Sequence, residues 1–220
     1  MVHCIRGYNE VSMVDGNIFW ILASSSPYRR KILQQIGLPF RSVDARIAEQ
    51  TMGIGEVPAR RVQTLARAKA EAVVCLALEQ GEACVLGMDT MVVHRGTMLG
   101  KPIDAVEAAK ILSSLQGQRH DIVTGYACLY FKAGRLAASR VCQRVTTVVF
   151  RSLSSAWQAW YVRTGEWRGK AGGYALQGLG STLIRRVEGD MGNGSGLSLD
   201  VLSDLCRSMG ITLEPFNVLE

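Results

Sequence analysis

The stretch Ile18–Gly37, which reads IFWILASSSPYRRKILQQIG, constrains the fold more than any other part of the chain. Its first six residues are apolar and stop at a run of three serines, a pattern that predicts a fully buried strand. Apolar residues then recur at helical spacing, with Ser26 as a suitable N-cap and Pro27 as a suitable first helical residue. The sequence therefore predicts a buried strand, a serine-rich turn and a helix that stops at Gly37.

This turn is a candidate anion site. The first N–H groups of a helix lack partners within the helix, and the helix dipole places about half a positive charge there. The hydroxyl groups of the turn and the guanidinium groups of Arg29 and Arg30 add donors at the same place, which suits a phosphate. A capped helix with solvated arginines is the simpler alternative, because the turn lacks a Walker-type glycine pattern.

The size and composition of the chain indicate an ordinary globular protein. Its 220 residues, 48% apolar and 20% charged, are enough for one large domain or two small lobes around a shared core. Residues 1–17 lack the apolar segment of a signal peptide and are expected to form a loosely ordered extension before a single domain over 18–220. No apolar run approaches the ~20 residues of a membrane-spanning helix, so we expect a cytoplasmic protein without membrane association.

Cysteine usage and net charge exclude several classes of site. The six cysteines and three histidines are scattered, without a CxxC pair. This distribution indicates a reducing compartment and argues against a disulfide framework or a zinc site. The net charge of +6 favours polyanions such as nucleotides, but the charge is spread along the chain, so nucleic acid is not specifically indicated.

Two charged residues stand out before the middle of the chain. Glu49 lies in a glycine-containing loop, Ala45–Val57, and Lys69 lies on the apolar stripe of a helix predicted from Pro58 to about Gln80. A lysine in that position either extends to solvent or reaches into a cleft with anionic contents. The other charged side chains of this helix are expected to face solvent: Arg60, Arg61, Arg67 and Glu71.

Asp89 interrupts the predicted buried strand Cys84–His94, and an ionised carboxylate in such a strand is costly unless it is paired or bound to metal. We therefore interpret Asp89 as a functional residue.

Lys101 follows this strand after a turn. The glycine-rich loop 165–180 presents Lys170, Tyr174 and Gln177 among small residues, as a loop that approaches a ligand would, although a mobile surface loop has a similar composition.

The order of the elements predicts an α/β fold. Two long β-branched segments, Asp121–Phe131 and Ala137–Phe150, flank a short glycine turn and are expected to pair as antiparallel strands. A second glycine-rich turn is expected at Gly189–Gly196, before a last helix. We expect a three-layer α/β/α domain around a central mixed sheet. The serine-rich turn, Asp89, Lys101 and the loop with Lys170 should converge at one cleft.

Seven blocks carry a family resemblance: LASSSPYRR (22–30), ARIAEQ (45–50), LARAKA (65–70), GMDTMVV (87–93), LGKP (99–102), KAGGYALQG (170–178) and GDMGNGSGLSL (189–199). Their ordered set resembles the Maf family of nucleoside triphosphate pyrophosphatases over nearly all of Ile18–Leu213. The resemblance implies a mixed-sheet fold like that of inosine triphosphatase, with the active site between two lobes. It also implies cleavage between the α and β phosphates of a nucleoside triphosphate, giving a monophosphate and pyrophosphate, with a divalent metal, Mg²⁺ or Mn²⁺.

The resemblance assigns roles to individual residues. Asp89 matches the family's essential aspartate, as base for the attacking water, metal ligand or both, and Glu49 matches a second acid that is a candidate metal ligand. The family lysines that neutralise the triphosphate and the leaving group match Lys69, Lys101 and Lys170. The implied substrate-binding set is Ser24, Ser26, Arg29, Lys170 and Gln177.

Substrate preference is less sharply indicated. Three specificity positions are typically Arg, Thr and Gln in the branch acting on dTTP and UTP, and here they are Tyr28, Thr90 and Gln177. The aromatic residue Tyr28 resembles the one in the branch acting on 7-methyl-GTP, where it would stack on the base. Thr90 and Gln177 instead favour dTTP, UTP and modified pyrimidine nucleotides.

The alternative from another functional class is a non-catalytic septum regulator or nucleic-acid binder. Whether the protein forms a homodimer stays open. Departures from the family pattern occur at Ala48, Gly169, Gly194, Ser195 and Ser198, and they leave the catalytic set intact.

Overall fold

The computed structural model describes residues 18–211 and 213, so the predicted N-terminal extension 1–17 lies outside the described residues. The strands are β1 (Phe19–Ala23), β2 (Phe40–Val43), β3 (Glu82–His94), β4 (Thr97–Leu99), β5 (Arg119–Lys132), β6 (Arg135–Phe150) and β7 (Ile184–Glu188). The α-helices are α1 (Pro27–Gln35), α2 (Pro58–Glu71), α3 (Cys75–Leu78), α4 (Ala105–Leu115), α5 (Ser155–Thr164), α6 (Met191–Gly194) and α7 (Leu199–Arg207). Three short 3-10 helices are η1 (Glu49–Thr51), η2 (Ala171–Gly173) and η3 (Gly178–Leu183).

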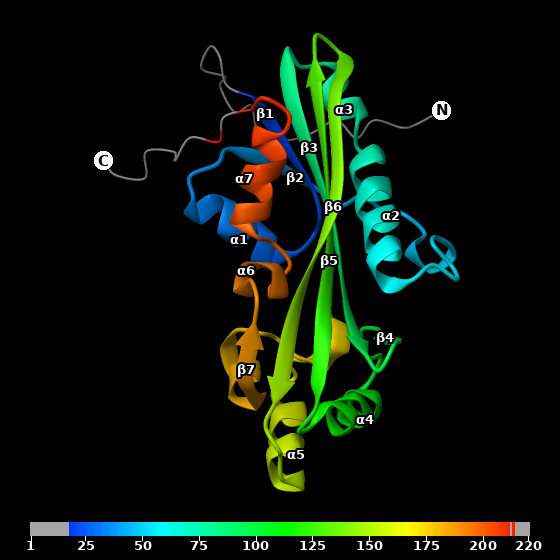
Figure 1. Ribbon diagram of the computed structural model, residues 1–220, viewed down its shortest axis with the longest axis vertical. Coiled ribbons are helices and arrows are strands. Elements are labelled where there is room, and N and C mark those ends of the chain that lie inside the picture. Colours follow the sequence, from blue (N-terminus) through cyan, green and yellow to red (C-terminus); the bar gives the residue numbers. More distant parts are fainter. Residues whose placement is uncertain (1–17, 212, 214–220) are drawn as a thin grey trace.

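One mixed sheet organises these elements, as the sequence predicts. Its strand order is β2-β1-β3-β5-β6-β7, and β4 pairs with part of β3. Strand β1 is parallel to both of its neighbours, β2 and β3, and all other pairs are antiparallel. The long strands β3, β5 and β6 run through the whole molecule and connect an upper lobe to a lower lobe (Figure 1).

The upper lobe has the predicted three layers. Helices α1 and α7 cover one face of the sheet and α2 covers the other (Figure 1). Strand β3 is buried on both faces here: Cys84 and Leu86 belong to the core under α1 and α7, whereas Ala83 and Val85 belong to the core under α2. Burial on both faces explains why this strand is apolar at nearly every position instead of alternating.

The lower lobe has a core of its own. It contains β4, β7, α4, α5 and the 3-10 helices η2 and η3, packed around the lower ends of the long strands (Figure 1). The buried side chains of this core include Leu112, Phe150, Tyr161, Trp167 and Leu183, and partly buried Leu99 of β4 and Ala171 of η2 pack against them. Within the described residues, no helix is both long enough and apolar enough to span a bilayer.

Two glycines let α2 lie close against the sheet. A Cβ atom at Gly87 would be 2.1 Å from the carbonyl oxygen of Ala66, and one at Gly125 would be 2.2 Å from that of Val62. Any side chain at these two positions would therefore push the helix outward. The close approach matters for the site, because α2 carries Lys69 toward β3.

Most local predictions are confirmed. Ser26 is the N-cap of α1, with Pro27 at its first turn, and Gly37 beyond the helix adopts a φ of 70°. The predicted helix from Pro58 to about Gln80 is wrong in its second half: α2 ends at Glu71 and the short helix α3 follows a turn. Two successive β-branched residues, Val73 and Val74, lie at this break, where they disfavour a continuous helix. The expected turn at 189–196 contains the short helix α6, which Asp190 caps.

Candidate active site

A cavity of about 1020 Å³ opens at a gap in the edge of the sheet. Strand β1 pairs with β3 as far as Gly87, and β4 pairs with it from Val92 onward. Between these points, residues 88–91 of β3 have no strand partner on that side in the described part of the chain. Successive residues of a strand point to opposite faces, and at this open edge both Asp89 and Thr90 line the same cavity.

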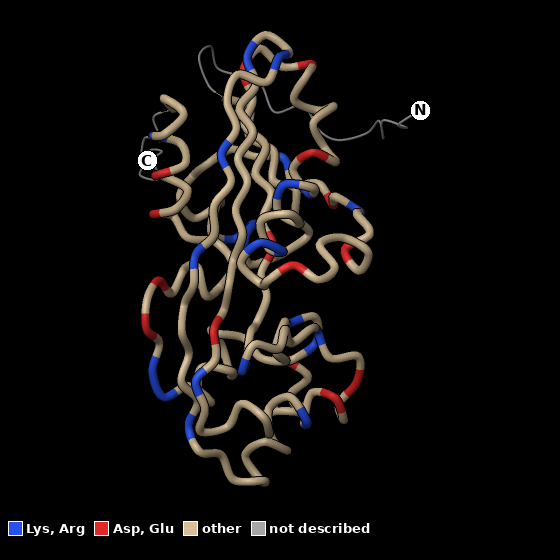
Figure 2. Tube along the Cα trace, turned by 45° about the vertical axis from the view of Figure 1, so that its right-hand side comes forward, with Lys and Arg blue, Asp and Glu red and all other residues tan. Residues whose placement is uncertain are grey.

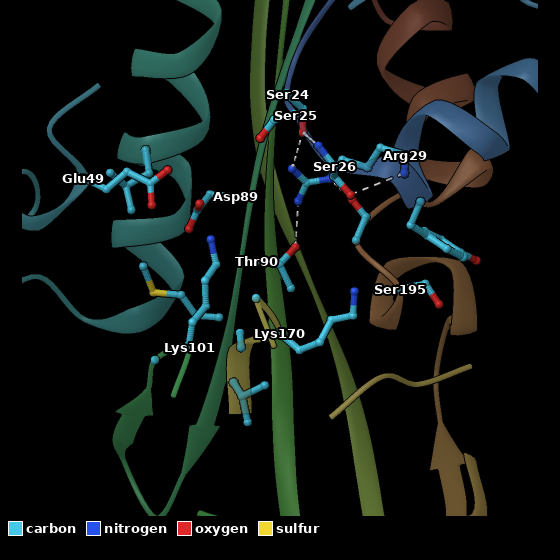
Figure 3. A pocket seen from close by; sticks show the side chains of 18 of the residues that line it. Ser24, Ser25, Ser26, Arg29, Glu49, Asp89, Thr90, Lys101, Lys170 and Ser195 are labelled. Carbon is cyan, nitrogen blue, oxygen red and sulfur yellow. Dashed lines mark hydrogen bonds between the residues drawn. The ribbon is translucent and has the colours of Figure 1, made fainter. Parts of the chain in front are cut away.

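The structure brings together every residue predicted for the site. They come from the β1–α1 turn, α1, η1, α2, β3, the loop after β4 and the glycine-rich loop, and they all line this cavity: Ser24, Ser26, Tyr28, Arg29, Glu49, Lys69, Asp89, Thr90, Lys101, Lys170 and Gln177. Figure 3 shows Ser24, Ser26, Arg29, Glu49, Asp89, Thr90, Lys101 and Lys170 around it. Glu49 and Asp89, which are 40 positions apart in the sequence, thus share one pocket. The role of each residue stays a prediction.

An ammonium group between two carboxylates forms the centre of the site. The Nζ atom of Lys69 lies 2.6 Å from an oxygen of Asp89 and 2.8 Å from an oxygen of Glu49. The side chains of Lys69 and Asp89 are only 13% and 10% exposed, so little water screens this pair, whereas that of Glu49 is 43% exposed. The alternative in which Lys69 simply extends to solvent is therefore wrong.

The positive charges of the site keep Glu49 ionised. Burial by itself would raise the pKa of Glu49, but the hydrogen bond and charge of Lys69, together with the charges of Lys101 and Arg29, lower it below its ordinary value of 4.5. The Glu49 carboxylate is therefore available as an anionic ligand at neutral pH.

The donor set at this position is compatible with a hard divalent cation. Among the described residues no group of three acidic, histidine or cysteine side chains is arranged to hold a metal alone. Glu49 and Asp89 each have a second carboxylate oxygen besides the one bound to Lys69. One or two carboxylates completed by substrate phosphates and water form a common Mg²⁺ site, so the residues fit such a metal.

The β1–α1 turn is held by its own hydroxyl groups and by Arg29. The N–H of Ser26 donates to Ser24 Oγ at 3.2 Å, and Ser26 Oγ accepts from the N–H of Arg29 at 3.5 Å. The Arg29 guanidinium is buried and donates to four protein groups: Ser24 Oγ, the Met88 and Gly196 carbonyls, and Thr90 Oγ1. Burial lowers the pKa of Arg29, and the negative charge of Asp89 partly offsets this by raising it.

Arg29 therefore ties together β1, β3 and the loop before α7. The sequence predicts that this residue holds phosphate, but the structure engages most of its N–H donors with the protein itself. Direct contact between Arg29 and a phosphate stays a prediction. Thr90, which accepts from Arg29, also lies 3.0 Å from Thr124 Oγ1 on the adjacent strand.

Two of the specificity positions contact each other across the cavity. Gln177 Nε2 donates to the hydroxyl oxygen of Tyr28 at 2.6 Å. Tyr28 is on α1 in the upper lobe and Gln177 is in the glycine-rich loop of the lower lobe, so this bond joins the two lobes. No sequence pattern predicts this contact, because the residues are 149 positions apart.

Lower-lobe contacts position the glycine-rich loop that carries Lys170 and Gln177. The N–H of Gly172 donates to the Gly100 carbonyl at 2.9 Å, which places Lys170 and Lys101 on adjacent loops. The Glu166 carboxylate accepts from the N–H groups of Leu179 and Gly180. The cationic side chains are therefore presented from an anchored loop.

The expectation that Arg61 faces solvent is wrong. Arg61, Leu65 and Lys69 all line the cavity, and their four-residue spacing places them on one face of α2. That spacing was the signal that sequence reasoning missed. Arg46, which has a left-handed φ of 40°, also lines the cavity and was not foreseen.

Along the described residues, the remaining positive charges are not gathered in one segment of the chain (Figure 2). Lys and Arg residues are scattered over both lobes and interleaved with Asp and Glu (Figure 2). Ion pairs such as Arg67–Glu71 and Arg119–Glu188 involve exposed side chains. The concentration of cations around the cavity is therefore the feature that favours an anionic ligand.

Comparison with known proteins identifies the family. The family model described as Maf-like protein matches residues 20–209. The chain belongs to the Maf family.

Curated relatives of this Maf protein are similar over almost their full length. A dTTP/UTP pyrophosphatase from Pelotomaculum thermopropionicum is 43% identical, with 90% of this chain and 98% of the relative covered. Relatives of the same name from Moorella thermoacetica and Deinococcus radiodurans are 41% and 40% identical, each over 87% of this chain and over 95% and 93% of their own lengths.

A solved structure shows a more distant likeness. A nucleoside-triphosphatase (dITP/XTP pyrophosphatase) from Mycobacterium abscessus is 14% identical and has a TM-score of 0.36, covering 88% of this chain and 96% of the other. This likeness is too low to support an inference about the site.

Proposed function

We propose that this Maf protein is a nucleotide pyrophosphatase that hydrolyses dTTP and UTP, together with modified pyrimidine nucleotides, to the monophosphate and pyrophosphate. The single observation that carries the proposal is the Glu49–Lys69–Asp89 cluster in a cavity lined by further cations. Relatives at about 40% identity that bear the name dTTP/UTP pyrophosphatase support the choice of substrate.

In the proposed reaction the chain's own groups bind the triphosphate and move one proton. The oxygen of a water molecule attacks the α phosphorus, the bond to the bridging oxygen of the β phosphate breaks, and pyrophosphate leaves with the electron pair. Asp89 accepts the proton that the water loses. Lys69, Lys101 and Lys170 offset the negative charge that develops on the leaving group.

Mg²⁺ or Mn²⁺ is the proposed cofactor, with Glu49 and Asp89 as its protein ligands. When bound, such a metal would supply additional charge compensation for the phosphate oxygens. The two carboxylates fit this task because each has an oxygen not engaged by Lys69 and both are held at the cavity wall.

Asp89→Asn tests the assignment directly. With dTTP and Mg²⁺, we expect the variant to lose pyrophosphate release by at least about a hundredfold, because the amide can neither accept the proton nor serve as an anionic ligand. Asp200→Asn is the matched control, since Asp200 is exposed in the first turn of α7, away from the cavity, and should keep normal turnover. Normal turnover by a folded Asp89→Asn protein would refute the role proposed for Asp89.

A nucleotide panel separates the substrate alternatives. The aromatic ring of Tyr28 lines the cavity and favours 7-methyl-GTP as the second candidate, because it can stack on a flat base. We expect faster pyrophosphate release from dTTP and UTP than from CTP, dGTP or 7-methyl-GTP. Preference for 7-methyl-GTP would overturn the proposed specificity, and absence of release from every nucleotide would favour the non-catalytic alternative.

A further inference from the structure

The side chain of Ser195 has a buried hydroxyl oxygen with no hydrogen-bond partner among the described residues. This residue follows α6 and lines the cavity (Figure 3). A buried polar group without a partner costs free energy, so it requires an explanation. Rotation of the side chain about its Cα–Cβ bond would turn the hydroxyl from this buried position into the cavity, where a ligand can supply the missing partner.

The backbone on both sides of Ser195 is fixed. A Cβ atom at Gly194 would be 2.7 Å from a methyl group of Leu176, so the loop packs directly against the glycine-rich segment. On the other side, the Gly196 carbonyl accepts from Arg29 Nε at 2.9 Å. The N–H of Ser195 itself donates to the Met191 carbonyl at 3.1 Å. The backbone of Ser195 is thus held at the cavity wall.

Its location indicates which part of a nucleotide it meets. Figure 3 shows Ser195 on the side of the cavity opposite Glu49 and Asp89, with Thr90 and the Lys170 side chain between them. The acid–lysine cluster marks the position of the reacting phosphate, so the far wall faces the nucleoside. Leu176, against which Gly194 packs, directly precedes Gln177.

The Gln177 amide is oriented toward the Tyr28 hydroxyl. Its Nε2 atom donates to the Tyr28 hydroxyl, which leaves Oε1 as an acceptor. An acceptor suits the ring N3–H of uracil or thymine, whereas N3 of cytosine has no hydrogen. The ring carbonyl oxygens beside that N–H then need donors.

We propose that the Ser195 hydroxyl donates a hydrogen bond to a ring carbonyl of uracil or thymine and is a specificity-determining residue of this chain. The inference rests on the proposed function, because it takes a pyrimidine nucleotide as the substrate. It names a base contact that neither the catalytic cluster nor the predicted specificity positions include.

Ser195→Ala tests the contact through binding as well as catalysis. For dTTP and UTP we expect KM to rise about three- to tenfold with kcat unchanged, the effect of one neutral hydrogen bond. Ser195→Thr keeps the hydroxyl and should restore the low KM. Ser113→Ala, at an exposed position of α4, is the control and should change neither constant.

Thio-substituted nucleotides identify the contacted atom. A thiocarbonyl is a poor acceptor, so the wild-type protein should bind either 2-thio-UTP or 4-thio-UTP more weakly than UTP, and Ser195→Ala should lose that difference. Equal KM values for the wild type and Ser195→Ala would overturn the inference. So would an effect confined to UTP and absent for dUTP, which would indicate the ribose, or weaker inhibition by inorganic tripolyphosphate, which would indicate the phosphates.

Calorimetry with α,β-methylene-UTP separates failure of this inference from failure of the proposed function. If the wild type binds the analogue but hydrolyses no nucleotide, the proposed function is wrong, and the affinities of the wild type and Ser195→Ala still decide the role of the hydroxyl. If the wild type hydrolyses dTTP but both proteins bind the analogue equally, only the inference about Ser195 is wrong. A wild type that binds no nucleotide overturns both.

Discussion

Replacing Lys69 with methionine removes the central charge of the site and keeps the length of the side chain. Its ammonium contacts Asp89 at 2.6 Å and Glu49 at 2.8 Å, so Lys69→Met leaves two carboxylates without their shared cation. Breaking a fully buried ion pair costs about 3–5 kcal/mol. Because Glu49 is 43% exposed and the cavity is open to water, we expect the free energy of unfolding to fall by about 2 kcal/mol.

The same change should impair catalysis. Loss of one group that stabilises developing charge typically lowers kcat by about 10²–10³-fold. Urea denaturation without metal measures the stability, and pyrophosphate release from dTTP measures the rate. Arg67→Met is the matched control, because Arg67 is on the same helix and forms only an exposed ion pair with Glu71. The control should lose no more than about 0.5 kcal/mol and keep full activity.

Magnesium provides a readout of Lys69→Met that does not depend on activity. If Glu49 and Asp89 bind the metal, removal of the competing ammonium should increase Mg²⁺ affinity. Saturating Mg²⁺ should then stabilise Lys69→Met more than the wild type, by about 1.4 kcal/mol for each tenfold gain in affinity. Equal stabilisation of both proteins by Mg²⁺ would refute the proposed metal ligands. A variant with unchanged stability and unchanged kcat/KM would refute the electrostatic role of Lys69.

Two further predictions follow from packing and from burial. Gly87→Ala should lower the free energy of unfolding measured with urea by about 1–3 kcal/mol and should reduce turnover, because the new methyl group would displace the backbone of α2 that carries Lys69. The control Gly81→Ala should leave the stability unchanged, because there is open space around Gly81. Equal stability of the two variants would contradict this packing argument. Burial lowers the pKa of His120 to about 4 from its ordinary 6.5, so between these values the unfolded chain binds a proton that the folded chain does not. The stability contributed by neutral His120 is complete above pH 6.5 and should decline as the pH falls, by about 3 kcal/mol at pH 4. Urea midpoints between pH 7 and 4 should therefore fall more steeply for the wild type than for His120→Gln, and parallel curves would contradict the assignment.

Sequence patterns predicted the parts of this fold that depend on neighbouring residues. The apolar run before Ser24, the N-cap Ser26 and the stop at Gly37 specify a strand, a turn and a helix through local hydrogen bonding and hydrophobic periodicity. The position of Asp89 inside a buried strand marked it as functional, because an unpaired charge is costly there. The position of Lys69 on an apolar stripe left open whether the side chain extends to solvent or reaches into a cleft. The family resemblance then joined these separate signals into one predicted site.

Contacts between distant segments decided the rest, and no local pattern encodes them. Strand β1 ends at Ala23, which leaves the edge of β3 open and allows side chains from both of its faces to line the cavity. The inward turn of Arg29 and the Tyr28–Gln177 bond depend on the placement of loops more than 140 residues away. The unpaired hydroxyl of Ser195 likewise results from packing. Its immediate sequence neighbours are the glycines Gly194 and Gly196, and its isolation exists only where that loop meets the sheet and the lower lobe.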